Sequence, residues 1–180
     1  IQKYTPSAAD LGYGDGYSDI MATEKSFTFL TNASWTPDLQ SGWSISNWTP
    51  IYNINYFLEH MREAKGLSEA TYNHYEGTAR FWRAWQYFEK VKTFGAVPWY
   101  DEPIDPEDMV ALYKPRDSRE YVMERVLEDL NFACEHCYTS SDWINCARIN
   151  RYIALAYKAR VCLFEGTYRK YHSVDPSTGK

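Results

Sequence analysis

Apolar side chains recur at steps of three and four residues in four stretches between residues 50 and 165. Such spacing gathers them on one face of an α-helix. The pattern predicts helices over residues 50–65, 69–94, 118–136 and 150–165. The expected caps are Thr49 with Pro50, Ser68, Asp117 with Glu120, and Asn150, and the expected stops are Gly66, Gly95 and Gly166.

Each predicted helix has a face that should be buried. The expected stripes are Ile51, Ile54, Phe57, Leu58 and Met61; Tyr72, Tyr75, Phe81, Trp82, Trp85, Phe88 and Val91; Tyr121, Val122, Val126, Leu127, Leu130 and Ala133; and Ile153, Ala154, Ala156, Tyr157, Val161 and Leu163. Small residues at Gly77, Ala79 and Ala84 mark where another helix should approach the second one closely. Because only two or three residues join the first helix to the second, these two should form an antiparallel hairpin.

The other segments carry no sustained helical period. Residues 1–47 are interrupted by glycine, proline, serine and asparagine, so we expect loops there and one short helix near Asp19–Thr23. Residues 95–116 contain four prolines and should form an ordered irregular connector. The prediction is an all-α fold, with a loop-rich N-terminal segment over residues 1–47 and two tetratricopeptide-like helical hairpins over residues 48–180.

A weak echo between the second and fourth helices favours such repeats. Ala84 stands four residues before Phe88, and Ala159 stands four before Leu163, as small and large residues do in tetratricopeptide repeats. Two hairpins are fewer than a stable repeat stack needs. We therefore expect this stretch to be a fragment of a larger domain, with an apolar face that the C-terminal remainder of the same protein covers.

Composition narrows the possible partners. The formal net charge is −5 and no run of basic residues occurs, so nucleic acid is not an expected partner. No apolar stretch approaches the roughly 20 residues that cross a bilayer. The chain begins at Ile1 rather than methionine, and we expect a processed piece whose export signal lies upstream. Aromatic residues reach 17%, enough for a core and for aromatic surface as well.

Four ordered segments resemble one known family. Residues 76–88 read EGTARFWRAWQYF and residues 94–98 read FGAVP, which resembles a signature of the SusD/RagB family of Bacteroidota surface lipoproteins. The PRDSRE entry at residues 115–120 and the ALAYKARVCLF run at residues 154–164 are similar to two further family segments. Trp48, Tyr52 and Asn55 resemble the entry to the family's first repeat helix. The resemblance extends over about residues 48–166.

The resemblance implies a function and a location. Members of this family are SusD-like glycan-binding proteins with a helical superhelix, and they bind oligosaccharides or polysaccharides without catalysing a reaction. They deliver these glycans to a SusC-like TonB-dependent transporter for nutrient uptake. They sit on the cell outer membrane, held by a lipid on a cysteine that would lie upstream of this chain. Neither a cofactor nor a metal ion is implied.

Aromatic residues near the start of the chain are the candidates for glycan contact. In the family, a loop before the first repeat helix contributes aromatic rings to the glycan platform. The candidate glycan-binding residues of this chain are Trp35, Trp43, Tyr17, Asp15 and Asn47. Flat rings suit the apolar face of a sugar, and carboxylate or amide groups suit its hydroxyls. The alternative is that Trp35 or Trp43 fills a gap between the loop and the helices. Trp82, Trp85 and Tyr87 have helical spacing and are expected in the core.

The four cysteines allow more than one interpretation. Cys134, His136, Cys137 and Cys146 could supply four zinc ligands, but their positions at a helix end would require that end to unwind. A disulfide between Cys137 and Cys146 is a second possibility. Free buried thiols are a third, and Cys162 on the fourth helical stripe is expected to be one.

No catalytic motif stands out. The chain has no zinc-protease, serine-hydrolase or phosphate-loop signature. Acid pairs do occur, at Asp15 with Asp19 and at Asp101 with Glu102 and Asp105, but such pairs are expected by chance among 24 acidic residues. Besides glycan binding, two alternatives stay open: a tetratricopeptide-like adaptor that binds peptides, and an all-α glycoside hydrolase.

Overall fold

The computed structural model describes residues 42–105, 107–139 and 148–172. Its helices are α3 (Ile45–His60), the 3-10 turn η2 (Met61–Glu63), α4 (Glu69–Phe94), the one-turn α5 (Met109–Leu112), α6 (Arg119–His136) and α8 (Arg151–Tyr171). Within those described ranges no strand forms, and one isolated bridge joins Val97 to Asp117. The predicted all-α fold of helical hairpins is confirmed. The short helix expected near Asp19–Thr23 lies outside the described residues.

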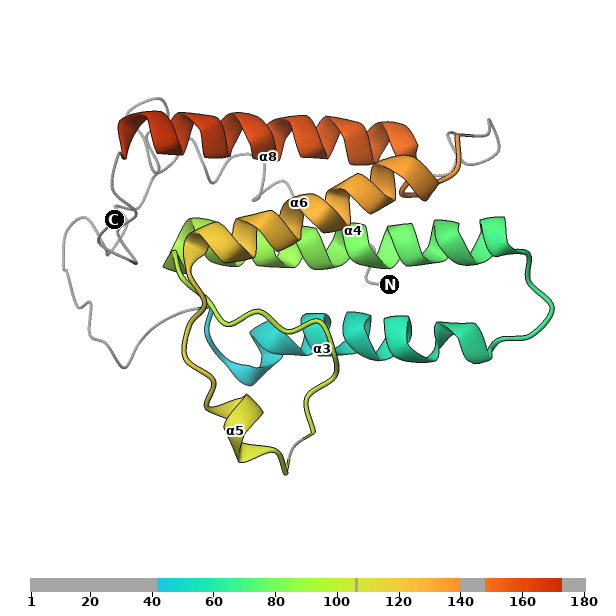
Figure 1. Cartoon of the computed structure of the whole chain (residues 1–180), viewed down its shortest axis with the longest axis horizontal. Helices are drawn as coiled ribbons and strands as arrows, with labels where there is room; N and C mark the ends of the chain where they lie inside the picture. Colours follow the sequence, from blue (N-terminus) through green and yellow to red (C-terminus); the bar gives the residue numbers. More distant parts are fainter. Residues whose placement is uncertain (1–41, 106, 140–147, 173–180) are drawn as a thin grey trace, which may run out of the picture. The chain divides into compact units, whose positions relative to one another are not determined.

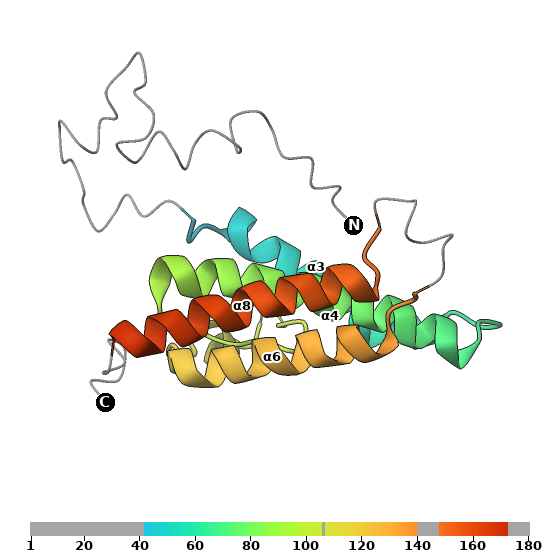
Figure 2. The same cartoon turned by 90° about the horizontal axis from the view of Figure 1, so that it is seen from above.

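The four long helices follow one another in space as they do in the sequence. Figure 1 shows α3 and α4 running antiparallel, with α6 on the other side of α4. Helix α8 packs against α6, and its Tyr157 and Phe164 rings also contact the Phe88 ring of α4. The view from above in Figure 2 shows α6 and α8 running side by side in opposite directions. This is the arrangement that two consecutive αα-hairpins give.

Helix α4 has the bounds that its sequence predicts. The Ser68 hydroxyl accepts a hydrogen bond from the Thr71 N–H at 3.2 Å, and this bond caps the start of the helix. The helix ends at Gly95, whose φ of +70° is a conformation that favours glycine. Because α4 has a neighbouring helix on two sides, it buries residues around much of its circumference. Among them Ala84, Tyr87 and Phe88 are essentially inaccessible.

The start of α3 differs from the prediction. The helix begins at Ile45, and Pro50 lies inside it instead of at its first position. Ser44 caps this earlier start: its backbone N–H donates to the Asn47 Oδ1 at 3.2 Å. The hydroxyl of Thr49, the predicted cap, donates instead to the Ile45 carbonyl at 2.9 Å. The first turn of α3 thus occupies the end of the segment expected to be loop.

Two other helix boundaries also differ. Helix α6 is capped by Ser118, whose hydroxyl accepts from the Tyr121 N–H at 3.2 Å. The predicted cap, Asp117, accepts instead from the Trp99 N–H at 2.8 Å and fastens the connector. Helix α8 starts behind its predicted cap Asn150 but runs past Gly166 to Tyr171, because a lone glycine costs an exposed helix only about 1 kcal/mol.

The core lies where α4, α6 and the first part of the connector meet. Its members from α6 are Val122, Met123, Val126, Leu130, Ala133 and Cys134, and the connector adds Val97 and Trp99. Helices α3 and α8 each have one packed side only, so they contribute few fully buried residues. Part of their predicted stripes is therefore exposed, which corrects the expectation for Phe57, Ile153, Ala156 and Leu163. Near the starts of α4 and α6, Tyr75 and Tyr121 are also exposed, which corrects the expectation for these two residues. Trp82 and Trp85 are only partly buried, whereas Tyr87 is in the core as predicted.

Helices α4 and α6 approach each other closely at Gly77. A side-chain carbon added there would lie 3.0 Å from the Cys137 Sγ and 3.4 Å from the Ala133 Cα of α6. The prediction that Gly77 marks a close helix contact is confirmed. Cys137 is a free buried thiol, and burial raises its pKa to about 11. Its suggested partner, Cys146, lies outside the described residues.

Cys134 is also a free buried thiol, whereas Cys162 is exposed, which corrects the expectation that it is buried. Cys162 is not among the few residues that α8 buries, which are Ala154, Val161 and Glu165. Among the residues that the structure describes, no group of three or more His, Cys, Asp or Glu side chains is placed to hold a metal ion.

Candidate functional site

An open groove of about 920 Å³ runs along the first half of α3 and the connector. Aromatic and aliphatic side chains predominate on its surface. The lining residues from α3 and the turn before it are Trp43, Ile45, Trp48, Thr49, Ile51, Tyr52 and Asn55. Those from the connector and α5 are Pro98, Tyr100, Glu102, Ile104, Leu112, Tyr113, Lys114, Pro115 and Arg116. Apolar pockets with a few polar groups are the usual form of small-ligand sites.

A cluster of rings forms the end of the groove near the start of α3. Gly42 has a φ of +94°, and a side-chain carbon there would lie 3.2 Å from the Phe94 ring. This turn places Trp43 edge-on against Phe94 and Trp48, with ring centroids 4.9 and 5.2 Å apart. Trp48 in turn meets Tyr100 edge-on at 6.1 Å. The rings hold one another in position and give the groove a rigid aromatic floor.

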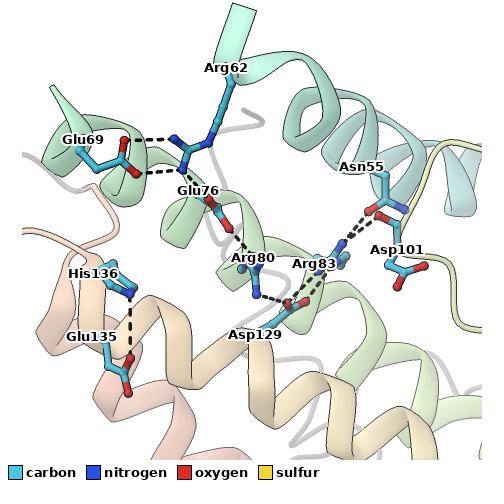
Figure 3. Close-up of polar contacts among 10 residues, drawn as sticks. All are labelled: Asn55, Arg62, Glu69, Glu76, Arg80, Arg83, Asp101, Asp129, Glu135 and His136. Atoms are coloured by element: carbon cyan, nitrogen blue, oxygen red, sulfur yellow. Dashed lines mark hydrogen bonds and ion pairs between the residues drawn. The ribbon is translucent and has the colours of Figure 1, made fainter. Parts of the chain in front are cut away.

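A buried polar clamp holds the connector against the helices. The Asn55 side-chain amide of α3 donates to the Tyr100 carbonyl at 2.8 Å and to the Glu102 carbonyl at 3.2 Å. Arg83 of α4 binds the carboxylate of Asp129 on α6 through two hydrogen bonds of 2.7 and 2.8 Å. Figure 3 shows Arg83 lying between Asn55 and Asp129. The clamp therefore fixes the wall of the groove to three helices at once.

Two tyrosines and a lysine complete this attachment. The buried Tyr87 hydroxyl accepts from the Tyr100 N–H at 2.7 Å. The Tyr100 hydroxyl donates to the Ala111 carbonyl at 2.9 Å, which ties α5 to the connector. Burial raises the pKa of both hydroxyls, so both stay neutral hydrogen-bonding groups. Lys114 donates to the Trp99 carbonyl at 3.1 Å.

Only part of the predicted glycan-binding set falls within the described residues. Trp43 lines the groove, as a glycan contact would require. Asn47 does not line it: its side-chain oxygen accepts from Ser44 at the start of α3. Trp35, Tyr17 and Asp15 lie outside the described residues.

The structure adds three tyrosines that sequence reasoning did not select. Tyr52, Tyr100 and Tyr113 all line the groove, and Tyr113 is 78% exposed. Tyr52 stacks on Tyr56 one helical turn later, and Tyr56 stacks on His60. Tyr52 and Tyr56 are exposed on α3 next to the buried Ile51 and Asn55, so aromatic residues outside the predicted apolar stripe were the available signal.

A second hollow, of about 610 Å³, is lined mainly by charged side chains. Figure 3 shows a series of ion pairs among these side chains, which extends from the joint between α3 and α4 to the clamp of Asn55, Arg83 and Asp129. Arg62 contacts Glu69 at 3.1 Å, and Glu76 contacts Arg80 at 2.8 Å. These four charges are thus paired with one another, whereas the groove beside α3 presents rings to solvent. The groove is the stronger candidate for a ligand site.

The sequence of this chain matches one known protein family over most of its length. A family model described as "Starch-binding associating with outer membrane" matches residues 7–163. The chain belongs to the SusD-like family. The family resemblance of the sequence is thereby confirmed. Among curated proteins, none matches this chain.

Solved structures agree with this membership. A SusD-like protein from Bacteroides fragilis is 30% identical, with a TM-score of 0.58; the match covers 66% of this chain and 23% of that one. A surface glycan-binding protein from Bacteroides fluxus is 24% identical over 72% of this chain and 28% of its own, with a TM-score of 0.54. A laminarin-binding SusD-like protein is 22% identical over 72% of this chain and 28% of its own, with a TM-score of 0.58.

This SusD-like chain spans about a quarter of the length of these relatives. The description of the family places its members at the outer membrane. Of the helices that the structure describes, none is long and apolar enough to cross a membrane.

Proposed function

We propose that the full-length protein binds oligosaccharides or polysaccharides through the groove beside α3. The observation that carries this proposal is the aromatic lining of the groove in a chain of the SusD-like family. Tyr52 and Tyr113 offer exposed rings for the apolar face of a sugar. Glu102, on the clamped connector, offers a carboxylate to sugar hydroxyls.

Membership of the SusD-like family supports a proposed role in the cell. The protein acts without catalysis, as a surface receptor that captures glycan and delivers it to a SusC-like TonB-dependent transporter for nutrient uptake. It is held at the outer membrane by a lipid on a cysteine upstream of this chain. Helices α3 with α4, and α6 with α8, are two helical hairpins of a larger domain in the full-length protein. Trp35, Tyr17 and Asp15 stay candidates for further ligand contacts.

A screen of the full-length protein against polysaccharides tests the proposal. In native gels that contain one polysaccharide each, we expect at least one to retard the protein. The Trp43→Ala variant should lose part of that retardation, because Trp43 supports the floor of the groove. Thin-layer chromatography of the incubated glycan should show no shortened product.

Two outcomes would contradict this proposal. A folded full-length protein that no glycan in the panel retards is not a glycan receptor of this kind. Release of shorter sugars would instead make the protein a hydrolase. For delivery, the measurement is co-purification with the SusC-like transporter from detergent-extracted outer membranes, and its absence would contradict that part of the role.

A further inference from the structure

Three charged side chains line the groove, and they differ in how far their charge is already neutralised. They are Glu102, Lys114 and Arg116. Lys114 lies 2.7 Å from the Asp117 carboxylate and also donates to a backbone carbonyl, so its charge is used within the fold. Arg116 makes no ion pair with any residue that the structure describes. It is the lining cation that is available to a ligand.

Arg116 is held in place by Trp43. Its guanidinium carbon lies 4.7 Å from the centre of the Trp43 ring, in a cation–π contact. This contact restricts a side chain that would otherwise be free to move, so less entropy is lost when a ligand binds. A guanidinium on a ring keeps N–H donors at its edge, and two of them match the oxygens of a carboxylate or a sulfate.

A second cation adds to the positive potential at the same end of the groove. The Lys90 ammonium lies 4.4 Å from the centre of the Trp48 ring and donates to the Asn47 carbonyl at 2.9 Å. No acidic partner of Lys90 occurs within the described part of the chain. Trp43 and Trp48 are in edge contact, so each of the two touching rings carries a cation.

The lining carboxylate, Glu102, lies at a different place along the groove. Its backbone is fixed to Asn55, seven residues after Trp48, which is about 10 Å along α3. The groove therefore has a basic end at Trp43 and an acidic side chain further along α3. This separation of positive and negative charge along the groove orients a ligand that carries a negative group at one end only.

We propose that the groove selects a glycan with an anionic sugar, a uronate or a sulfated residue, whose charged group binds Arg116 beside Trp43. The inference rests on the proposed glycan-binding function and adds to it a class of ligand. Neutral sugars of the same chain lie along Tyr52 and Tyr113, and their hydroxyls reach Glu102. Uronates and sulfated sugars offer Arg116 the same kind of oxygen pair, so the test separates them.

The test uses the full-length protein and two matched pairs of probes. One pair is polygalacturonate and its carboxyl-reduced form; the other is a sulfated galactan and its desulfated form. Affinity is measured by calorimetric titration for the native protein, for Arg116→Gln, and for Arg160→Gln. Arg160 is an exposed cation on α8 and serves as the control. Circular dichroism verifies that each variant is folded.

We expect one anionic probe to bind at least about tenfold more tightly than its neutral form. Arg116→Gln should weaken binding of the anionic probe by about ten- to a hundredfold and so remove most of its advantage over the neutral form, while Arg160→Gln should leave the affinity for both forms at the native value. The anionic probe that responds identifies the group as carboxylate or sulfate.

The inference is overturned if the neutral forms bind as tightly as the anionic ones, or if Arg116→Gln keeps full affinity. Neither result would contradict the proposed glycan-binding function. If neither these probes nor any neutral glycan binds the folded protein, the proposed function itself fails, and the inference fails with it.

Discussion

The clamp of Asn55, Arg83 and Asp129 shows how single residues shape the site. Asp129 is 2% exposed and is bound to Arg83 by two short hydrogen bonds. Removing one member of a buried ion pair leaves the other charge without a partner, which costs about 3–5 kcal/mol. We expect Asp129→Ala to lower the free energy of unfolding by that amount in urea denaturation.

An exposed ion pair on the same helix provides the control for Asp129. Arg125 and Glu128 lie 2.5 Å apart, with side chains 35% and 52% exposed. Surface pairs of this kind contribute about 0–1 kcal/mol. Glu128→Ala should therefore change the stability by no more than about 1 kcal/mol. An equal loss of unfolding free energy in Asp129→Ala and Glu128→Ala would show that Asp129 is not part of a buried clamp.

We expect the stability to depend on pH through His74. Burial lowers the pKa of His74 below its usual value of 6.5, and its Nδ1 accepts a hydrogen bond from the Tyr138 N–H at 3.1 Å. Below pH 6.5 the unfolded chain binds more protons at this residue than the folded chain, so stability decreases as the pH falls. We expect the melting temperature to fall from pH 7.5 to pH 5.5.

The variant His74→Asn isolates this residue. An asparagine oxygen can accept from the Tyr138 N–H as Nδ1 does, but it does not titrate in this range. Differential scanning calorimetry should therefore show a smaller loss of melting temperature between pH 7.5 and 5.5 for the variant. Identical pH profiles for the two proteins would exclude His74 as the cause.

For single residues, the sequence predicts the type of side chain at the site better than it predicts where each side chain lies in the fold. The family resemblance makes Trp43 a candidate, because aromatic residues in the loop before the first repeat helix contribute to the family's glycan platform, and Trp43 does line the groove. Tyr113 could not be selected, since only the path of the connector brings it opposite α3. Asn47 was selected for its amide, but the amide belongs to a capping arrangement that depends on where α3 begins.

Among the elements, α4 and α6 depend on the small size of Gly77. An added side-chain carbon would meet a sulfur at 3.0 Å and a backbone carbon of α6 at 3.4 Å, and the latter cannot move without moving the helix. We expect Gly77→Ala to destabilise the protein by about 1–3 kcal/mol in chemical denaturation, because overpacking outweighs the better helix propensity of alanine.

Gly166 offers the matched control within α8. A side-chain carbon at Gly166 would meet no atom within 4 Å. Gly166→Ala should therefore stabilise the protein by up to about 1 kcal/mol through helix propensity alone. We therefore expect Gly77→Ala to lower the free energy of unfolding and Gly166→Ala to raise it. A Gly77→Ala variant that is more stable than the native protein would contradict the close packing of α4 on α6.

Helix positions were predictable because each long helix combines an apolar period with a cap and a stop. The predictions failed where two signals competed. Pro50 indicated a helix start, but the capping arrangement at Ser44 lies earlier and extends the helix through the proline. Gly166 indicated the end of the last helix, but a single glycine does not stop α8, which continues to Tyr171. Local signals of similar strength cannot be ranked without the packing around them.

At the scale of the whole molecule, α8 has an apolar outer surface. Its exposed apolar residues are Tyr152, Ile153, Leu155, Leu163, Phe164 and Tyr171. Large exposed apolar surfaces promote association. Residues 1–180 produced alone should therefore self-associate, as size-exclusion chromatography with light scattering would show. The double variant Leu155→Lys and Leu163→Lys should be more monomeric, and a native-sequence piece that is already a stable monomer would contradict this expectation.

The most direct test of glycan binding in the groove is a calorimetric titration of the full-length protein with the glycan that binds best in the screen. Tyr52 and Tyr113 are exposed rings in the groove, whereas Tyr152 and Tyr171 are exposed rings on α8. The double variant Tyr52→Ala with Tyr113→Ala should bind at least about tenfold more weakly, a loss of about 1.4 kcal/mol or more. The double variant Tyr152→Ala with Tyr171→Ala should bind as the native protein does. Full affinity in the groove variant, or an equal loss in the α8 variant, would show that the glycan does not bind in the groove beside α3.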